Sequence, residues 1–289
     1  MLVHIKSILS KAQKNNCAIG AFNTSNLEVT LGIVRGAVEK KSPVIIQVSE
    51  STIKYAGLKT ITGLVQLIAN TEGKSIPIAL HLDHGKSFKS VAECIKAGFS
   101  SVHIDASDLP YEENILLTKQ AVDYAHRFGV WAQAELGAML GKEGMTLADI
   151  PEDRDSFMTN PSKVKDFVKQ TKVNTLAVSV GTLHGYFKGE EKIDFPRLEK
   201  IYQEVPKMPL VLHGASGLDN KDLSRSIKFG VRIVNIDTDL RIAFTETLKQ
   251  TLKDIKPGFY DPRKILTPSV EAITEVVKKK IDILGSSNI

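Results

Sequence analysis

A chain of 289 residues with 42% hydrophobic and 25% charged residues has the composition of an ordinary globular protein. No apolar run approaches the ~20 residues of a membrane-spanning helix, and residues 1–6 lack the features of a secretory signal, so we expect a cytoplasmic protein with no membrane partner. The net charge of +5 comes from basic residues spread among almost as many acidic ones. An anionic small substrate explains this surplus, and without a recognisable motif we expect no nucleic-acid partner. Cys17 and Cys94, the only cysteines, give no disulfide framework, which fits a reducing compartment.

Short apolar or β-branched runs alternate with amphipathic stretches, as in repeated βα units. Asn26–Lys40 and Tyr111–Arg127, for example, carry apolar residues at helical spacing. The runs predict eight strands, at Ala18–Phe22, Pro43–Val48, Ile76–Leu82, Ser101–Ile104, Val130–Glu135, Thr175–Val180, Leu210–His213 and Val231–Ile236. This count favours an α/β fold of the (β/α)8 TIM-barrel type over an open doubly wound sheet, with residues 1–289 as one domain.

Two segments interrupt the alternation of strands and helices. Residues 137–160 are rich in glycine and charge, and a connection of this length predicts a mobile active-site loop. Residues 257–289 begin with turn residues and end in an amphipathic pattern. We expect a C-terminal helical extension there rather than a second domain.

Three histidines follow apolar runs, at or after the ends of predicted strands, and precede glycine. They are His84, His184 and His213. Any one of them alone would more often be a buried structural histidine. The C-terminal ends of barrel strands meet at one rim, however, so the three histidines are expected to lie together there. Three imidazoles predict a divalent transition-metal site with one coordination position left open for substrate. His81 and His103 lie one layer deeper, two residues before Asp83 and Asp105, and are expected to be structural.

Two turns near the end of the chain are suited to phosphate. Residues 213–217 (HGASG) and 235–239 (NIDTD) follow the last two predicted strands, where barrels often bind phosphate through backbone N–H groups. Gly214 would let the backbone approach a ligand, and Ser216 and Thr238 could donate hydroxyl groups.

Together these motifs resemble the class II, metal-dependent fructose-bisphosphate aldolases over nearly the whole chain. The resemblance rests on GAFNTSNLE (20–28), VSES (48–51), HLDHG (81–85), SVHIDAS (101–107), AELG (134–137), GTLHGYF (181–187), LHGASG (212–217), NIDTDLR (235–241) and DPRK (261–264).

The resemblance implies a role for each matching residue. It assigns His84, His184 and His213 as ligands of Zn²⁺ or another divalent transition metal, and Asp105 and Glu135 to an alternative, more buried metal position. It implies that Asp83 is the catalytic acid/base and that Glu143, the single acid in GKEG, acts from the mobile loop. The residues implied to bind substrate are Asn23, Ser49, Gly185, Gly214, Ala215, Ser216, Asn235, Asp237, Thr238, Arg241 and Arg263.

Within that last set the resemblance separates two ends of the substrate. The glycine-rich turns would hold dihydroxyacetone phosphate, together with a monovalent cation such as Na⁺ or K⁺. Ser49, Arg241 and Arg263 would hold the far phosphate, with one arginine supplied by a neighbouring subunit of a homodimer or homotetramer.

The implied reaction is reversible cleavage of fructose 1,6-bisphosphate to dihydroxyacetone phosphate and glyceraldehyde 3-phosphate, in glycolysis and gluconeogenesis. The metal would stabilise the enediolate. Tagatose 1,6-bisphosphate is the alternative substrate, although Asp237 could hydrogen-bond a hydroxyl and favours fructose. A Schiff-base aldolase would need a lysine at a strand end, and Lys86 reads as the start of a solvated helix. A non-catalytic, barrel-derived binding protein is disfavoured because Asp83 and all three histidines are present.

Overall fold

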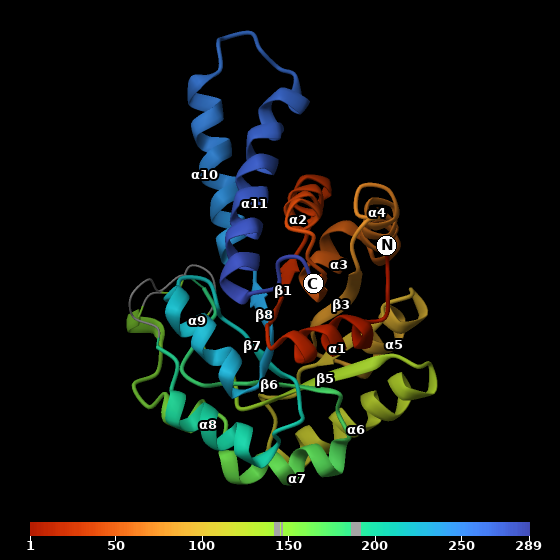
Figure 1. The fold of residues 1–289 in the computed structure, drawn as a ribbon, viewed down its shortest axis with the longest axis vertical. Helices are drawn as coiled ribbons and strands as arrows, with labels where there is room; N and C mark the ends of the chain where they lie inside the picture. The colour runs from red at the N-terminus through yellow and green to blue at the C-terminus, as the bar shows by residue number, and fades with distance from the viewer. Residues whose placement is uncertain (142–144, 146, 186–191) are drawn as a thin grey trace.

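The computed structural model describes residues 1–141, 145, 147–185 and 192–289, and in this part of the chain eight parallel strands close into a barrel (Figure 1). The strands are β1 (Ile19–Asn23), β2 (Val44–Ser49), β3 (Ile78–Gly85), β4 (Ser101–Ile104), β5 (Trp131–Leu136), β6 (Thr175–Val178), β7 (Leu210–Leu212) and β8 (Val231–Ile236). They pair in chain order, and β8 pairs with β1 to complete the circle. The predicted barrel is confirmed; the largest shift is at β3, which ends at Gly85 rather than Leu82.

Apart from α1, the helices that surround the barrel bury apolar residues against the outward side chains of the strands. The helices are α1 (Ile5–Asn15), α2 (Leu27–Glu39), α3 (Glu50–Ala56), α4 (Leu58–Asn70), α5 (Phe88–Lys96), α6 (Tyr111–Arg127), α7 (Pro161–Thr171), α8 (Phe195–Glu204), α9 (Asn220–Ser226), α10 (Thr238–Asp254) and α11 (Pro262–Leu284). Several begin at a side chain that accepts a free N–H of the first turn, as Asn26 does for α2 and Asp194 for α8. No helix in the described part of the chain combines the length and apolarity needed to cross a membrane.

Helix α1 closes the N-terminal end of the barrel. Its residues Ile5, Ile8 and Leu9 are buried in one cluster with inward-facing residues of the strands, among them Ile19 of β1 and Ile45 of β2. Small residues at the inner positions of other strands leave room for these side chains. With this end filled, the opposite end is where a cavity can form.

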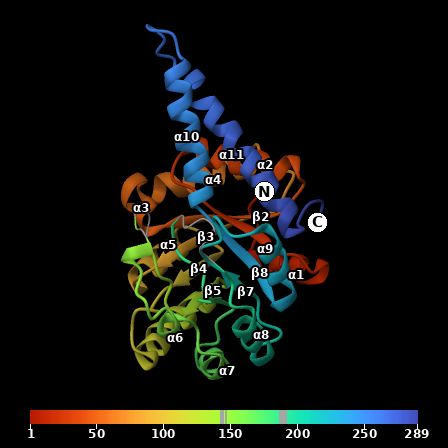
Figure 2. The same cartoon turned by 90° about the vertical axis from the view of Figure 1, so that its left-hand side faces the viewer.

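The expected C-terminal helix is present, and it is firmly packed. The two helices α10 and α11 form an antiparallel pair whose outer part projects away from the barrel (Figure 1; Figure 2). At its base α11 crosses α2 at two glycines: a Cβ on Gly32 would lie 2.6 Å from Ile273, and one on Gly36 would lie 2.9 Å from Val277. The final segment therefore contributes to the core instead of trailing from it.

The connection between β5 and α7 contains two short 3-10 helices, η1 (Leu147–Asp149) and η2 (Asp155–Phe157). Its ends are held by backbone hydrogen bonds from Ala138 to Phe157 and from Thr159 to Ser179. Leu140 forms an isolated β-bridge with Leu183, in the connection after β6. This bridge brings the loop to the C-terminal rim of the barrel.

Candidate active site

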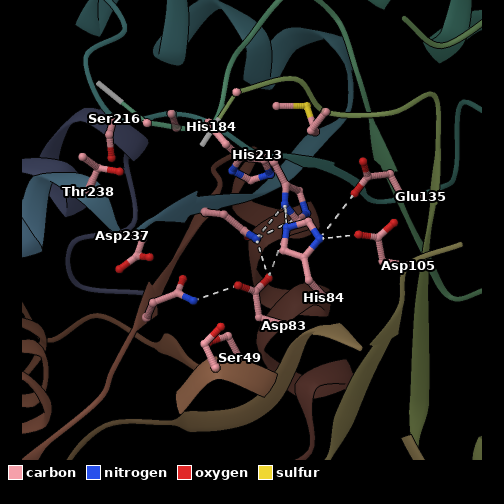
Figure 3. Close-up of a pocket in the computed structure, with 18 of the residues that line it drawn as sticks. Ser49, Asp83, His84, Asp105, Glu135, His184, His213, Ser216, Asp237 and Thr238 are labelled. Carbon is pink, nitrogen blue, oxygen red and sulfur yellow. Dashed lines mark hydrogen bonds and ion pairs between the residues drawn. The ribbon is translucent and has the colours of Figure 1, made fainter. Parts of the chain in front are cut away.

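A cavity of about 490 Å³ opens at the C-terminal ends of the strands (Figure 3). It gathers 16 of the 18 predicted site residues: Asn23, Ser49, Asp83, His84, Asp105, Glu135, His184, Gly185, His213, Gly214, Ala215, Ser216, Asn235, Asp237, Thr238 and Arg241. Glu143 lies outside the described residues. Arg263 is described but lies elsewhere, at the exposed start of α11.

Asp83 and His84 are neighbours in the chain, and both face this cavity, although successive residues of a regular strand point to opposite faces. Strand β3 pairs with β4 at Leu82–Val102 and next at Gly85–Ile104, so the register shifts between these pairs. Within this bulge His84 has a φ of 48°, in the left-handed region. The bulge thus aims an acid and an imidazole into the same cavity.

The three predicted metal-binding histidines lie together. The ring of His84 is centred 4.6 Å from that of His213 and 5.1 Å from that of His184 (Figure 3). His84 Nε2 and His213 Nδ1 are 2.9 Å apart. The backbone of His184 is fixed by the loop after β5, because its N–H donates to the Leu140 carbonyl at 2.7 Å. Residues 129 positions apart in the chain are therefore joined at one point.

Two buried carboxylates flank His84 on the other side. Asp105 Oδ2 lies 2.7 Å from His84 Nδ1, and Glu135 Oε2 lies 4.0 Å from the same atom (Figure 3). Burial raises the pKa of Glu135 to about 8, and the charge of Asp105 adds to this effect. Glu135 Oε2 is buried without a hydrogen-bond partner.

These donors fit a divalent transition metal. Ligand-type atoms lie within 4.8 Å of one another in two groups: Asp83, His84, His103 and His213, and His84, His103, Asp105 and Glu135. Imidazole nitrogen suits such metals, and a buried carboxylate oxygen without a partner indicates that a cation completes the site. His84 and His213 share the first group, and His84, Asp105 and Glu135 share the second, whereas His184 belongs to neither group.

Asp83 is buried but hydrogen-bonded at both oxygens. Asn23 Nδ2 donates to Oδ2 at 2.7 Å, and Asn235 Nδ2 donates to Oδ1 at 3.3 Å. Burial alone would raise the pKa of Asp83, but the charge of His84 and the bond from Asn23 outweigh it and hold the pKa below its usual value. The side chain is therefore a carboxylate positioned to accept a proton.

The glycine-rich turn follows β7 beside His213. Gly214 has a φ of 63°, and a Cβ there would overlap the Leu183 carbonyl, so the turn accommodates glycine only. Ser216 Oγ accepts the Asp239 N–H at 3.2 Å, which ties this turn to the first turn of α10. Thr238 is the first residue of α10, so backbone N–H groups of a helix N-terminus border the cavity.

The two arginines predicted to bind the far phosphate lie in different places. Arg241 lines the cavity and pairs with Asp237, with Nη2 2.7 Å from Oδ2. Arg263 pairs with Asp261 next to it and has a side chain that is 87% exposed. Arg263 is absent from the residues that line the described cavity of its own chain.

Sequence reasoning missed Lys86 as a lining residue. The sequence pattern predicts that Lys86 begins a solvated helix, but β3 continues to Gly85 and Lys86 lines the cavity, with Nζ 2.8 Å from Asp105 Oδ2. Burial would lower its pKa, but Asp105 and Asp108 outweigh burial and raise it. The amine is therefore charged, which is unsuitable for a Schiff-base nucleophile. Its position after a strand that ends in HLDHG was the available signal.

The closed (β/α)8 barrel gathers imidazoles, carboxylates and a glycine-rich turn at its C-terminal rim. These features are typical of a barrel enzyme whose active site can bind a metal ion. The chain belongs to the class-II fructose-bisphosphate aldolase family, whose sequence model matches residues 3–289. This family is metal-dependent, and membership makes the chain an aldolase, which is a lyase.

Individual relatives agree over the full length. The chain is 41% identical over 288 residues to a fructose-bisphosphate aldolase of Staphylococcus aureus, covering 99% of this chain and 98% of the relative. It is 40% identical to a fructose-bisphosphate aldolase of Thermus caldophilus, covering 99% of each. Among solved structures, the YdjI aldolase from Escherichia coli K12 superposes with a TM-score of 0.85 at 29% identity, covering 100% of this chain and 99% of that one.

Proposed function

We propose that the chain cleaves fructose 1,6-bisphosphate reversibly to dihydroxyacetone phosphate and glyceraldehyde 3-phosphate, as a step of glycolysis and gluconeogenesis. The observation that carries the proposal is the bulge that directs Asp83 and His84 into one cavity, which His213 and the glycine-rich turn also line. Cleavage of a phosphorylated ketose requires a proton acceptor, a group that stabilises negative charge and a site for phosphate. The cavity offers Asp83, the candidate metal ligands and the glycine-rich turn for these roles.

The metal we propose is Zn²⁺ or a similar divalent ion, held by His84, His184 and His213. Three imidazoles leave a coordination position for substrate, and Asp105 and Glu135 could serve a more buried position. When bound, the ion supplies Lewis-acid stabilisation of the negative charge that develops on the ketose oxygens.

Asp83 is proposed to take the proton of the C4 hydroxyl. As this proton leaves, the C4 oxygen becomes the aldehyde oxygen, the C3–C4 bond breaks, and its electron pair remains on C3 of the dihydroxyacetone phosphate half. Asn23 and Asn235 would hold the carboxylate in line for the transfer. A proton delivered to C3 completes the product, and we assign that delivery to Glu143, which lies outside the described residues.

Both phosphates have proposed partners. The turn at Gly214, Ala215 and Ser216, with Gly185 and the start of α10, would hold the dihydroxyacetone phosphate end, with a monovalent cation beside it. Ser49 ends β2 on a different side of the cavity from Ser216 and Thr238 (Figure 3), which supports its assignment to the far phosphate. Arg241 and Arg263 would join Ser49 there.

We infer fructose rather than tagatose as the sugar. Asp237 lines the cavity, and its carboxylate can hydrogen-bond a substrate hydroxyl, so the C4 configuration can be distinguished. The names of the Staphylococcus aureus and Thermus caldophilus relatives support the same choice.

The chain is further proposed to act as a homodimer or homotetramer in the cytoplasm. Arg263 lies outside the cavity of its own chain, so it could reach a far phosphate only in a neighbouring subunit. Cys17 and Cys94 are buried free thiols, which supports a reducing compartment.

The experiment is to incubate the purified chain with fructose 1,6-bisphosphate or tagatose 1,6-bisphosphate and to follow triose phosphate. We expect faster release from the fructose substrate, and loss of release after a chelator has removed the metal. Release that survives complete metal removal would contradict the metal-dependent mechanism, and faster cleavage of the tagatose substrate would reverse the sugar assignment.

A further inference from the structure

The bulge in β3 frees a backbone donor from the ladder, and a buried ring accepts it. The His84 N–H donates at 3.3 Å to Nδ1 of His103, which belongs to β4 and is fully buried. The backbones also approach closely here, because a Cβ on Gly85 would lie 2.7 Å from the His103 carbonyl oxygen. His103 therefore contacts the bulge through its ring, and its backbone limits the bulge to a glycine at position 85.

The acceptor role of Nδ1 fixes the tautomer of the neutral His103 ring. The proton must then be on Nε2. His103 Nε2 lies 3.8 Å from Glu135 Oε2, and both atoms are buried without a hydrogen-bond partner in the described structure. The ring thus presents its acceptor to His84 and its donor side to Glu135.

We propose that His103 is a positioning residue that holds the His84 backbone in its left-handed conformation and so directs the His84 imidazole into the metal site. A φ of 48° is unfavourable for a residue with a side chain, and without an acceptor the buried N–H would be unpaired. Loss of the His103 acceptor would let the bulge relax toward a regular strand. In a regular strand, residue 84 faces away from residue 83. The inference depends on the proposed function only in taking His84 as a metal ligand.

Two substitutions separate the two sides of the ring. In His103→Asn the amide can occupy the position of Nδ1, whereas in His103→Gln it can occupy the position of Nε2; His103→Leu removes both. The measurement is the dissociation constant for Zn²⁺, obtained by competition with a chromophoric chelator in the absence of substrate. We expect His103→Asn to keep the affinity of the original chain, and the other two variants to lose about 10–100-fold, as when a group that orients a metal ligand is removed.

His81→Leu is the matched control. His81 is equally buried, on β3 itself, but its Nδ1 bonds Ser101 Oγ at 2.9 Å rather than the His84 backbone. This variant should retain Zn²⁺ affinity, and thermal unfolding of each metal-free variant shows which ones fold. Equal affinity in all three His103 variants would overturn the proposal, as would an equal loss in His103→Asn and His103→Gln. Failure of the original chain to bind Zn²⁺ would instead overturn the proposed function.

Discussion

Two buried carboxylates lie close to the His84 ring, Asp83 Oδ1 at 3.9 Å from Nε2 and Glu135 Oε2 at 4.0 Å from Nδ1, and their pKa values shift in opposite directions. Asp83 accepts hydrogen bonds at both oxygens, and its pKa is held down. Glu135 has an oxygen without a partner, and its pKa is raised to about 8 by burial first and by Asp105 second. Asp83 is therefore ready to accept a proton, whereas Glu135 becomes a ligand only when a cation offsets its burial.

Asp83→Asn should separate proton transfer from metal binding. The amide cannot accept the C4 hydroxyl proton, so we expect turnover of fructose 1,6-bisphosphate to fall by about 10²–10⁴-fold. Metal content measured by elemental analysis should stay close to that of the original chain. Substantial residual turnover would exclude Asp83 as the acid/base.

The metal-free chain should be most stable near pH 6.5 and lose stability on the acid side. Burial lowers the pKa of His81 and His184 to about 4 and that of His103 to about 3, and it lowers the pKa of His213 as well. Below pH ~6.5 the unfolded chain binds protons at these rings that the folded chain excludes, and each such proton changes stability by about 1.4 kcal/mol per pH unit.

Two groups act in the opposite direction. The folded chain keeps the Glu135 proton to about pH 8 and the His84 proton to about pH 9, whereas the unfolded chain loses them near pH 4.5 and 6.5. Stability from Glu135 therefore declines between about pH 4.5 and 8, and stability from His84 declines between about pH 6.5 and 9, while the four buried histidines outweigh Glu135 below pH 6.5. Urea unfolding midpoints measured between pH 5 and 9 test this balance. A midpoint that rises steadily as the pH is lowered from 7 to 5 would contradict it.

At the scale of elements, strand ends and the loops after them set the cavity walls. The bulge in β3 supplies Asp83 and His84, and the turn after β7 passes so close to Leu183 that only glycine fits at position 214. Ser216 then connects this turn to α10. Each functional group thus depends on a contact between two elements.

Gly214→Ala should be compared with Gly258→Ala. Both glycines have positive φ, of 63° and 87°, but a Cβ at Gly258 meets no atom within 4 Å. We expect Gly258→Ala to cost about 1 kcal/mol of folding free energy through backbone strain alone. Gly214→Ala should cost about 1–3 kcal/mol more, because the turn must also shift away from the Leu183 carbonyl.

The measurements are urea unfolding and the KM for fructose 1,6-bisphosphate. Only Gly214→Ala should raise the KM, since position 258 lies between α10 and α11, outside the residues that line the cavity. Equal losses of stability in the two variants would show that overlap with Leu183 is unimportant.

At the scale of the whole molecule, the C-terminal helices have one packing role and one proposed role. The base of α11 packs on Gly32 and Gly36 of α2, which leads us to treat residues 1–289 as one folding unit. The outer part of the pair projects from the barrel (Figure 2). Arg263 is the second residue of α11, and its side chain is exposed. Arg263 does not line the cavity of its own chain, which is why we propose that it serves a neighbouring subunit.

A mixing experiment tests this placement. Arg263→Ala should weaken binding of the far phosphate, and Asp83→Asn should inactivate its own site. In a mixed oligomer the Asp83→Asn subunit would still lend its Arg263 to the partner, so we expect activity at low substrate to exceed the sum of the separate variants. Each variant mixed with itself is the control. Strictly additive activity would place Arg263 outside the partner site.

The sequence by itself determined the barrel and most of the rim. Strand length and period follow from local apolar patterning, and the C-terminal ends of parallel strands must meet at one edge, so His84, His184 and His213 could be placed together before any distance was known. The position of Lys86 is not predicted, because β3 continues beyond Leu82 to Gly85 and the local sequence pattern does not indicate this extension.

Only the tertiary structure decided how neighbouring residues such as Asp83 and His84 come to face one cavity. That depends on a register shift against β4 and on the ring of His103, which accepts the freed N–H from another strand. The sequence pattern is local, with a period of two along a strand, whereas a bulge is a contact between strands. The sequence thus specified which groups reach the rim, and the packing of β3 on β4 specified where they point.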